Sequence, residues 1–361
     1  MSSVKLAPRL VTVAACQLGP IHLSDSRQDV LKRMCLLLDQ CAKEGVKLAV
    51  FPELAFTTFF PRYFLEGKNL DQYFEIENPS EGGIEQSANV KPLLDHAKSL
   101  GIDVYVGYAE RSIQSDGSHI DYNSSLYYSS QEGKVIGKYR KVHLPGSVEP
   151  HTEPGSFQQL EKRYFRNGDL GFPAFRAPGL VNGALKKSRD ISDASQTAGK
   201  GDPIIGMLIC NDRRWAEAWR VYGLQGLELM CCGYNTTAFR STSTGHPVPG
   251  LSPEAAEEEM TFHHKLSCQG NSYMNACFSI NVAKTGSEDG HPLIGGTIIV
   301  HPLGHIIKEA KTKEDEIVVA TIDLADCRQL KTSVFAFEKH RKPESYHSII
   351  ERTGPIEPEL L

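Results

Sequence analysis

Apolar and polar positions along the chain follow two periods, one typical of buried strands and the other of amphipathic helices. Residues 10–17 (LVTVAACQ) form a β-rich apolar run, and residues 30–42 then repeat apolar side chains at every third or fourth position. Ser26 and Asp29 together resemble an N-terminal cap, so we expect this helix to begin close to them. With the short apolar strand that follows at residues 47–51, the start of the chain predicts a β-α-β unit.

The same alternation continues through the rest of the chain. We expect further helices at residues 90–100, 215–224 and 260–274. We expect further strands at residues 102–109, 125–130, 134–138, 204–209, 227–232, 277–282, 294–300 and 317–322. Alternation of this kind predicts an α/β protein in which helices cover the faces of sheets.

Two polar segments interrupt this alternation, at residues 179–202 and 237–258. The first is rich in Gly, Lys, Ser and Asp, and the second carries prolines and glycines that oppose regular structure. Because strand and helix patterns resume after each, we interpret both as surface insertions in a single domain of residues 1–361. The C-terminal residues 335–361 mix aromatic and charged side chains, and predict either an arm that docks on a neighbouring subunit or a tail packed on its own domain.

Composition narrows the choice of partner. The chain has 361 residues, of which 40% are hydrophobic and 23% charged, as in an ordinary globular protein. Its formal net charge of -5 provides no general basic field, which argues against nucleic acid and acidic membranes and favours a small-molecule substrate. No apolar run approaches the roughly 18 residues of a membrane span, and the N-terminus lacks the apolar core of a secretory signal. We therefore expect a soluble, cytoplasmic protein.

The cysteines and histidines give no sign of a metal site. Nine cysteines lie mostly inside apolar stretches and follow no framework of paired spacings, so reduced thiols are expected. No cluster of Cys and His has zinc-finger spacing, and the adjacent His263 and His264 cannot both face one metal from a single helix. We expect neither a metal nor another cofactor.

Three blocks just beyond predicted strand ends carry the candidate chemistry, since open α/β sheets bind their ligands at such ends. They are FPELAFTTFFPR at residues 51–62, GKYRKVHLPG at residues 137–146 and MLICNDRRWAEAWR at residues 207–220. In the third block Cys210 ends an apolar strand just before a predicted helix, whose dipole and free N–H groups would lower the pKa of the thiol. The alternative is a buried, inert cysteine, which we prefer for the other eight.

The first two blocks supply a carboxylate and a cation. Glu53 precedes an apolar Leu-Ala-Phe run, so its carboxylate would be partly desolvated, which suits a general base. Alone, a Pro-Glu pair at a strand end is typical of a solvated turn. Lys141 could stabilise an oxyanion, but with Lys138 and Arg140 it also fits an ordinary charged face. Spacing alone leaves both alternatives open.

Taken together, the three blocks resemble the three signature regions of the nitrilase, or carbon–nitrogen hydrolase, superfamily, in the same order of Glu, Lys and Cys. The resemblance covers nearly the whole chain and looks closest to the N-carbamoyl-D-amino acid amidohydrolases. Further matching motifs are VGYAE at residues 106–110, LEKRYF at 160–165, GDLGFP at 168–173 and GYNT at 233–236. The resemblance implies a four-layer α-β-β-α sandwich, assembly into homodimers or homotetramers, and amidohydrolase chemistry that needs no metal.

The resemblance also implies roles for individual residues. Glu53 matches the general base of the family, Lys141 the oxyanion-stabilising cation and Cys210 the nucleophile. Glu161 matches a second carboxylate near the lysine. His143 matches a pocket histidine, and the alternative is that it only forms hydrogen bonds that shape its loop.

Substrate contacts are expected from residues close to the candidate nucleophile. Arg213 and Arg214 suit the α-carboxylate of an N-carbamoyl amino acid, because a guanidinium binds carboxylate bidentately, although a surface salt bridge would also explain them. Asn211 and Thr236 match further carboxylate-side contacts of the family. This chain has Gln159 where members of the branch often have His. The difference could alter the orientation of the substrate or the rate of the reaction.

The implied activity is hydrolysis of the carbamoyl C–N bond of N-carbamoyl D-amino acids through a covalent cysteine intermediate, with release of amino acid, ammonia and carbon dioxide. Within the superfamily the alternatives are a β-ureidopropionase-like enzyme, an aliphatic amidase and a nitrilase. A non-catalytic protein that keeps the fold for assembly or metabolite sensing is the alternative outside enzymes. The arginine pair favours carbamoyl amino acids, since a nitrilase needs no anion clamp, and retention of all three reactive residues argues against a non-catalytic protein.

Overall fold

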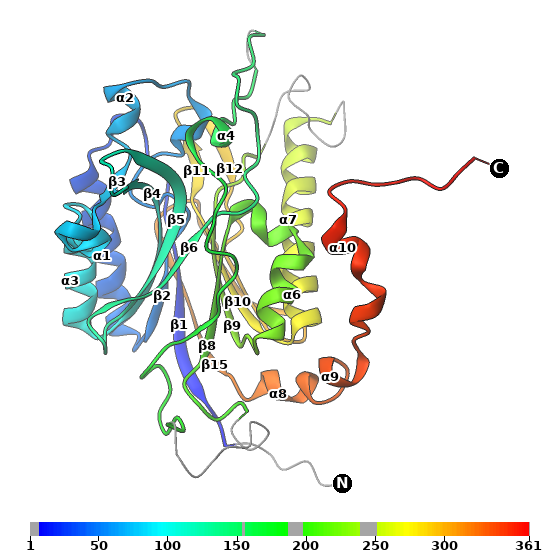
Figure 1. Cartoon of the computed structure of the whole chain (residues 1–361). Coiled ribbons are helices and arrows are strands. Elements are labelled where there is room, and N and C mark those ends of the chain that lie inside the picture. The colour runs from blue at the N-terminus through cyan, green and yellow to red at the C-terminus, as the bar shows by residue number, and fades with distance from the viewer. Residues whose placement is uncertain (1–6, 154–155, 187–197, 239–250, 361) are drawn as a thin grey trace.

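The computed structural model describes residues 7–153, 156–186, 198–238 and 251–360, and two β-sheets form its centre (Figure 1). The strands of the first sheet are β1 (Leu10–Gln17), β2 (Leu48–Val50), β3 (Glu75–Glu77), β4 (Asp103–Ile113), β5 (His119–Ser129), β6 (Lys134–Arg140) and β15 (Glu316–Asp323). They follow the order β15-β1-β2-β4-β5-β6, and β3 also pairs with β4. The pairs β1·β2 and β2·β4 are parallel, as a β-α-β unit requires.

The second sheet packs face to face against the first. Its strands are β7 (Phe175–Arg176), β8 (Ile204–Ile209), β9 (Leu229–Tyr234), β10 (Phe278–Ala283), β13 (Ile298–Val300) and β14 (Ile306–Glu309). They follow the order β14-β13-β10-β9-β8-β7, and β8, β9 and β10 run parallel. A separate two-stranded ribbon pairs β11 (Thr285–Glu288) with β12 (His291–Ile294).

Helices cover the outer face of each sheet (Figure 1). On the first sheet lie α1 (Arg27–Lys43) and α3 (Val90–Leu100), and on the second lie α6 (Ala216–Leu224) and α7 (Pro253–Asn275). The shorter helices are α2 (Lys68–Asp71), α4 (Glu161–Tyr164), α8 (Asp326–Lys331), α9 (Phe337–His340) and α10 (His347–Glu351). The predicted four-layer α-β-β-α sandwich is therefore confirmed.

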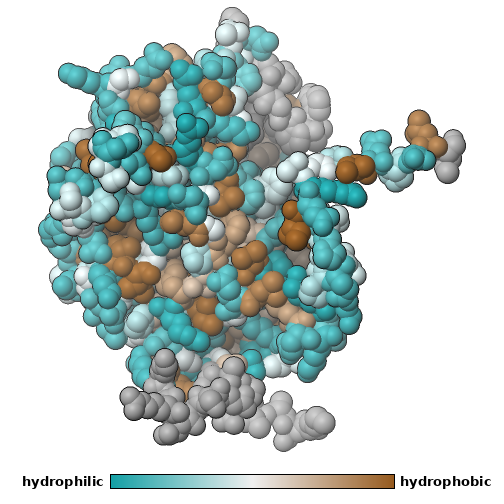
Figure 2. Space-filling model, viewed as in Figure 1, coloured by the Kyte–Doolittle hydropathy of each residue, from teal (hydrophilic) through white to brown (hydrophobic). Residues whose placement is uncertain are grey.

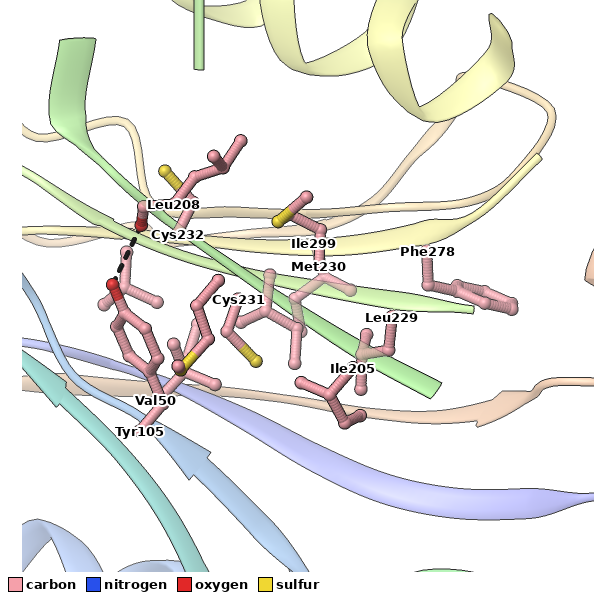
Figure 3. Close-up of a cluster of buried hydrophobic side chains, with 14 of the residues drawn as sticks. Val50, Tyr105, Ile205, Leu208, Leu229, Met230, Cys231, Cys232, Phe278 and Ile299 are labelled. Atoms are coloured by element: carbon pink, nitrogen blue, oxygen red, sulfur yellow. Dashed lines mark hydrogen bonds between the residues drawn. The ribbon is translucent and has the colours of Figure 1, made fainter. Parts of the chain in front are cut away.

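Apolar side chains from the two sheets interlock between them (Figure 3). Val50 and Tyr105 of the first sheet and Ile205 and Leu229 of the second all belong to this cluster, and all four are fully buried. Removing such a side chain from water contributes roughly 1.5–3 kcal/mol to folding. The Tyr105 hydroxyl also donates a hydrogen bond of 2.9 Å to the carbonyl oxygen of Leu208, so the core fixes the sheets relative to each other.

The predicted start of the first helix is confirmed. Ser26 is the N-cap of α1, where its Oγ accepts a hydrogen bond from the backbone N–H of Asp29 at 3.1 Å. The buried side chains of α1 recur every three or four residues, at Val30, Met34, Leu37, Leu38 and Cys41. This spacing directs one face of the helix into the apolar layer over the first sheet.

Two predicted boundaries are wrong. Helix α7 begins at Pro253 instead of residue 260, because Ser252 caps it and proline is tolerated in a first turn. The strand expected at residues 294–300 is broken by Gly295 and Gly296, whose φ angles of 60° and 77° are left-handed. Of the two expected insertions, residues 187–197 and 239–250 lie outside the described residues.

The C-terminal segment begins by packing on its own domain. The ring of Phe335 meets Tyr273 of α7 edge-on at 5.0 Å, and the Arg220 guanidinium of α6 lies 4.2 Å from the centre of the Phe337 ring. On the face that includes this segment, apolar side chains are scattered among hydrophilic ones (Figure 2). Within the described segments, every helix is too short or too polar to span a bilayer.

Candidate active site

Two strands from each sheet end at the candidate site. In the first sheet, Glu53 follows β2 and Lys141 follows β6. In the second sheet, Cys210 follows β8 and Asn235 follows β9. A cavity of about 220 Å³ adjoins these ends, as expected for an α/β protein. In the described part of the chain it is lined by Pro145, Gln159, Cys210, Asn211, Arg214, Asn235, Thr236, Met260 and His263.

A buried cluster of charges lies at the ends of the first-sheet strands. The Lys141 ammonium nitrogen is 2.7 Å from Glu53 Oε1 and 2.6 Å from Glu161 Oε2. None of the three side chains is exposed. A buried ion is stabilised only when opposite charges and hydrogen bonds surround it, so each member of this cluster depends on the others. The sequence motifs thus converge, with Glu161 supplied by the first turn of α4.

The cluster determines the protonation of its members. Burial lowers the pKa of Lys141, but neighbouring anionic groups outweigh burial and raise it above its ordinary value, so Lys141 stays a cation. Burial raises the pKa of Glu161 to about 7, and the charge of Glu53 adds to this effect while Lys141 opposes it. Near neutral pH, a proton can therefore reside on Glu161.

Two asparagines that the sequence did not single out hold the Glu53 carboxylate. Asn123, inside β5, donates from Nδ2 to Glu53 Oε1 at 2.8 Å and to Glu161 Oε2 at 3.2 Å. The backbone N–H of Asn235 donates to Glu53 Oε2 at 3.1 Å. The carbonyl oxygen of the same Asn235 accepts from Cys210 Sγ at 3.3 Å. Asn235 therefore connects the carboxylate to the thiol, and its only sequence signal was its place in GYNT.

Close backbone packing positions Glu53. Gly107 of β4 and Gly233 of β9 flank its main chain, one from each sheet. A Cβ atom on Gly107 would lie 2.7 Å from Glu53 Cα, and one on Gly233 would lie 2.6 Å from Glu53 N. Only glycine allows this approach, so the two sheets fix the carboxylate between them. Leu54, the next residue, has a left-handed φ of 46°, which turns the chain away.

The environment of Cys210 differs from the prediction in one respect. The residue has a left-handed φ of 50° and begins a short 3-10 helix, Cys210–Arg214, whereas α6 begins only at Ala216. Cys210 therefore does not stand in the first turn of α6. Burial raises the pKa of the thiol, the charge of Glu53 raises it further, and Lys141 only partly opposes them. The predicted lowering of this pKa is wrong, because burial outweighs the nearby cations.

The structure separates the two arginines that were expected to act together. Arg213 is fully buried and is not among the residues that line the cavity. Its guanidinium donates to the Cys210 carbonyl oxygen at 2.7 Å, to Thr236 Oγ1 at 2.9 Å and to His264 Nδ1 at 3.1 Å. It also lies 4.3 Å from the centre of the Tyr234 ring. With these partners Arg213 supports the turn that carries Cys210, whereas Arg214 lines the cavity.

Arg214 lies in the cavity wall together with Asn211 and Thr236, two of the other residues expected to contact substrate. Its Nη1 donates to Asn211 Oδ1 at 3.2 Å, and Asn211 Nδ2 donates to the His143 carbonyl oxygen at 3.1 Å. Thr236 and Gln159 also line the cavity. Gln159 Nε2 is 3.4 Å from Oε1 of Glu161, so this departure from the family pattern lies at the edge of the charged cluster.

His143 is not among the cavity-lining residues. Its Nδ1 is 2.7 Å from Asp212 Oδ1, and its ring stacks on Trp215 at 4.7 Å with the planes 7° apart. Asp212 Oδ2 also accepts a hydrogen bond of 2.8 Å from Tyr139. These contacts tie the loop after Lys141 to the turn after Cys210, which fits the loop-shaping alternative.

The outer helix also contributes to the cavity. Met260 and His263 of α7 line it, and His263 Nε2 forms an ion pair with Glu259 at 3.1 Å when the ring is protonated. Sequence reasoning considered His263 only as a metal ligand and did not place it here. In the residues that the structure describes, no three His, Cys, Asp or Glu side chains form a group suited to a metal ion.

Comparison with known proteins identifies the family. Residues 12–332 match the carbon–nitrogen hydrolase family. The chain belongs to this family. As a carbon–nitrogen hydrolase it is an enzyme of the amidohydrolase type, as the three sequence blocks predicted.

This carbon–nitrogen hydrolase resembles several named relatives along nearly its whole length. It is 26% identical to N-carbamoylputrescine amidase of Oryza sativa subsp. japonica, with 95% of this chain and 96% of the relative covered. It is 25% identical to citrullinase of Francisella tularensis, with 95% and 99% covered. Among solved structures, Saccharomyces cerevisiae Nit3, a member of branch 10 of the nitrilase superfamily, matches with a TM-score of 0.66 at 20% identity, covering 95% of this chain and 100% of that one. The predicted superfamily and fold are confirmed.

The raised pKa of Glu161 predicts how the stability of this carbon–nitrogen hydrolase depends on pH. Between about 4.5 and about 7 the folded carboxyl keeps a proton that the unfolded one has lost, so the free energy of unfolding should fall as pH rises through this window. The variant Glu161→Gln should lack this contribution, which we expect to be a few kcal/mol. Urea unfolding at a series of pH values measures the difference.

An exposed glutamate provides the control for that series. Glu149 has a side chain that is 81% exposed, so Glu149→Gln should give a curve parallel to that of the wild type. A wild-type curve that also runs parallel to the Glu161→Gln curve would show that Glu161 takes up no proton in this window.

Proposed function

We propose that this carbon–nitrogen hydrolase cleaves the carbamoyl C–N bond of N-carbamoyl D-amino acids and yields the amino acid, ammonia and carbon dioxide. The observation that carries the proposal is the buried contact of Lys141 with Glu53, next to a cavity that Cys210 lines. Sulfur, carboxylate and ammonium are the groups that covalent hydrolysis of an amide-type carbon requires. Arg214 in the same cavity adds a cation suited to an α-carboxylate.

In the first step, Glu53 takes the proton of the Cys210 thiol while the sulfur attacks the carbamoyl carbon. The C=O electron pair moves to oxygen and then returns, and the bond to the terminal –NH2 breaks. That nitrogen takes the proton from Glu53 and leaves as ammonia, so a thiocarbamoyl enzyme remains. Transfer during attack suits a thiol whose pKa is raised by burial, because such a thiol is protonated until the substrate arrives.

In the second step, Glu53 removes a proton from water as the water oxygen attacks the thiocarbamoyl carbon. The bond from carbon to sulfur breaks, and the proton passes to the sulfur of Cys210. The released N-carboxy amino acid loses carbon dioxide and becomes the free amino acid. One water is consumed for each ammonia released, and the enzyme returns to its starting state.

Lys141 stabilises the oxygen that becomes negative in both steps. An ammonium has three N–H donors, and in the described structure two of them are directed at Glu53 and Glu161. These two carboxylates fix the orientation of the third donor, which is then available to the oxyanion. The positive charge is present before substrate binds, so the site needs little reorganisation during the reaction.

The substrate class is supported by the cavity and by the relatives. A volume of about 220 Å³ suits a compact substrate. The rice relative is named for a carbamoyl compound, which supports a carbamoyl group as the reacting part. Selectivity for D-amino acids rests on the resemblance of ICNDRRWAEAWR and GYNT to the D-carbamoylases.

Arg214 should discriminate in favour of substrates that carry an α-carboxylate. Replacing it by glutamine removes a charge-assisted contact, so we expect KM for an N-carbamoyl D-amino acid to rise roughly ten- to hundredfold. The amide of the same compound, which lacks the carboxylate, should be hydrolysed equally by wild type and Arg214→Gln. Steady-state ammonia release with both compounds measures this difference, and an equal loss for both would argue against carboxylate binding.

A rate panel tests the proposed substrate class as a whole. It compares D- and L-N-carbamoyl α-amino acids, N-carbamoyl-β-alanine, a simple aliphatic amide and a nitrile, with the wild-type enzyme. The highest kcat/KM is expected for the D-N-carbamoyl α-amino acids. Faster turnover of the nitrile or of the simple amide would overturn the proposal in favour of a nitrilase or an aliphatic amidase.

A further inference from the structure

The two-stranded ribbon of β11 and β12 lies at the same end of the sandwich as α4 (Figure 1). Its second strand holds part of the cavity wall. The backbone N–H of Ile294 donates to the Thr236 carbonyl oxygen at 3.0 Å, and the N–H of Ala238 donates to the Pro292 carbonyl oxygen at 2.8 Å. Because Thr236 lines the cavity, β12 fixes the segment of the wall that follows β9.

The other strand of the ribbon holds the loop that carries Glu53. Glu288, the last residue of β11, accepts on Oε2 a hydrogen bond of 3.1 Å from the backbone N–H of Phe59. The ammonium of Lys284, between β10 and β11, donates to the Thr57 carbonyl oxygen at 2.7 Å. Both contacts are made to main-chain atoms of the segment between β2 and residue 60. The ribbon therefore connects this loop of the first sheet to the cavity wall of the second.

Glu288 and Lys284 belong to a buried cluster of charges that is separate from the one around Lys141. Glu288 Oε1 is 3.1 Å from Lys284 Nζ, and Glu288 Oε2 is 3.2 Å from Arg62 Nη2. All three side chains are buried. Burial lowers the pKa of Lys284, and the charge of Glu288 opposes this effect. Since apolar residues of similar size often stabilise a core as well as a buried ion pair does, stability alone does not explain the cluster.

The loop needs such contacts because it is strained next to Glu53. Leu54 has a left-handed φ of 46°, a conformation that persists in a bulky residue only where the surroundings hold it. On the near side, the backbone N–H of Ala55 donates to the Gly107 carbonyl oxygen at 2.9 Å. On the far side, the loop is held at residues 57–59 by the ribbon. Without the far contacts the strained stretch can relax, and the Glu53 carboxylate then moves with it.

We propose that Glu288 and Lys284 are positioning residues, which act through residues 57–59 to hold the carboxylate of Glu53 within reach of Cys210. Neither side chain is among the described residues that line the cavity, so neither should contribute to substrate binding. Their loss should lower kcat and leave KM nearly unchanged. This inference rests on the proposed function, since it assumes that Glu53 takes the proton of the thiol.

The variant Glu288→Gln tests the proposal, because it keeps the size of the side chain and leaves two buried cations without their anion. We expect kcat for an N-carbamoyl D-amino acid to fall roughly ten- to hundredfold, with KM within about twofold of the wild type. Labelling by iodoacetamide gives a readout that needs no carbamoyl substrate. In that reaction the sulfur of Cys210 displaces iodide while Glu53 takes the thiol proton, so labelling should slow by a similar factor. Mass spectrometry of the peptide that contains Cys210 follows it.

A second buried ion pair provides the control, at the other end of β9. Glu228 directly precedes this strand, whereas Asn235 directly follows it. Glu228 Oε2 accepts from Arg9 Nη2 at 3.1 Å, and both side chains are buried. Glu228→Gln should therefore lose stability comparable to that lost by Glu288→Gln, as urea unfolding measures. Its kcat and its rate of Cys210 labelling should stay close to those of the wild type.

Three outcomes overturn the inference. They are a Glu288→Gln variant with wild-type kcat and labelling, equal losses of activity in Glu288→Gln and Glu228→Gln, and a rise of KM with kcat unchanged. If Glu288→Gln does not fold, Lys284→Met removes the contact to Thr57 and leaves Glu288 paired with Arg62, and the same measurements apply. If the wild type releases no ammonia from any N-carbamoyl amino acid, the proposed function fails, and the labelling of Cys210 still decides whether the ribbon positions Glu53.

Discussion

Replacing Cys210 by alanine should lower ammonia release from an N-carbamoyl D-amino acid by roughly 10⁴-fold or more. The proposed reaction passes through a bond between sulfur and the carbamoyl carbon, and alanine offers no atom that can form it. Removing a nucleophile from an enzyme that acts through a covalent intermediate has effects of this order. A coupled ammonia assay measures the rate, and mass spectrometry of rapidly quenched wild type should detect the thiocarbamoyl enzyme.

A second cysteine provides the control for this variant. Cys35 lies on α1, on the outer face of the first sheet, and Cys35→Ala should release ammonia at nearly the wild-type rate. Both variants should unfold at similar denaturant concentrations, because each substitution removes a single sulfur. Ammonia release by Cys210→Ala at a rate close to that of the wild type would rule out the assigned nucleophile.

Much of the fold could be predicted because its elements are encoded locally. The period of apolar residues predicted α1 and its cap at Ser26, and short apolar runs predicted the strands that carry Glu53 and Cys210. The stacking of the two sheets was not encoded in any period. The prediction that the two sheets stack came from the resemblance to the family, since packing between distant segments leaves no local pattern in the sequence.

The parts of the site that could not be predicted all depend on contacts between distant segments. Asn123 looks like any polar residue in a strand until β5 brings it to Glu53, which lies 70 positions earlier. Arg213 and Arg214 are adjacent in sequence, yet one faces the buried interior and the other the cavity. The pKa of Cys210 depends on how fully other elements cover it, which the strand-to-helix pattern did not reveal.

The largest combined effect on stability and activity is expected for Lys141→Met. This variant removes the ammonium that contacts Glu53 at 2.7 Å and Glu161 at 2.6 Å, and leaves two buried carboxylates without their cation. Removing one partner of a buried ion pair typically destabilises a protein by about 3–5 kcal/mol. Loss of the oxyanion contact should lower kcat roughly 10²- to 10³-fold or more. Urea unfolding and ammonia release measure the two effects.

Lys134 of β6 is the control for this variant, because its side chain is 60% exposed and Lys134→Met should change stability by less than about 1 kcal/mol.

A double variant then separates charge balance from catalysis. Lys141→Met with Glu161→Gln removes one of the two uncompensated carboxylates, so it should recover part of the lost stability relative to Lys141→Met alone. It should recover no activity, because neither methionine nor glutamine places a cation at the developing oxyanion. Recovery of activity together with stability would mean that Lys141 supports the fold and takes no part in the reaction.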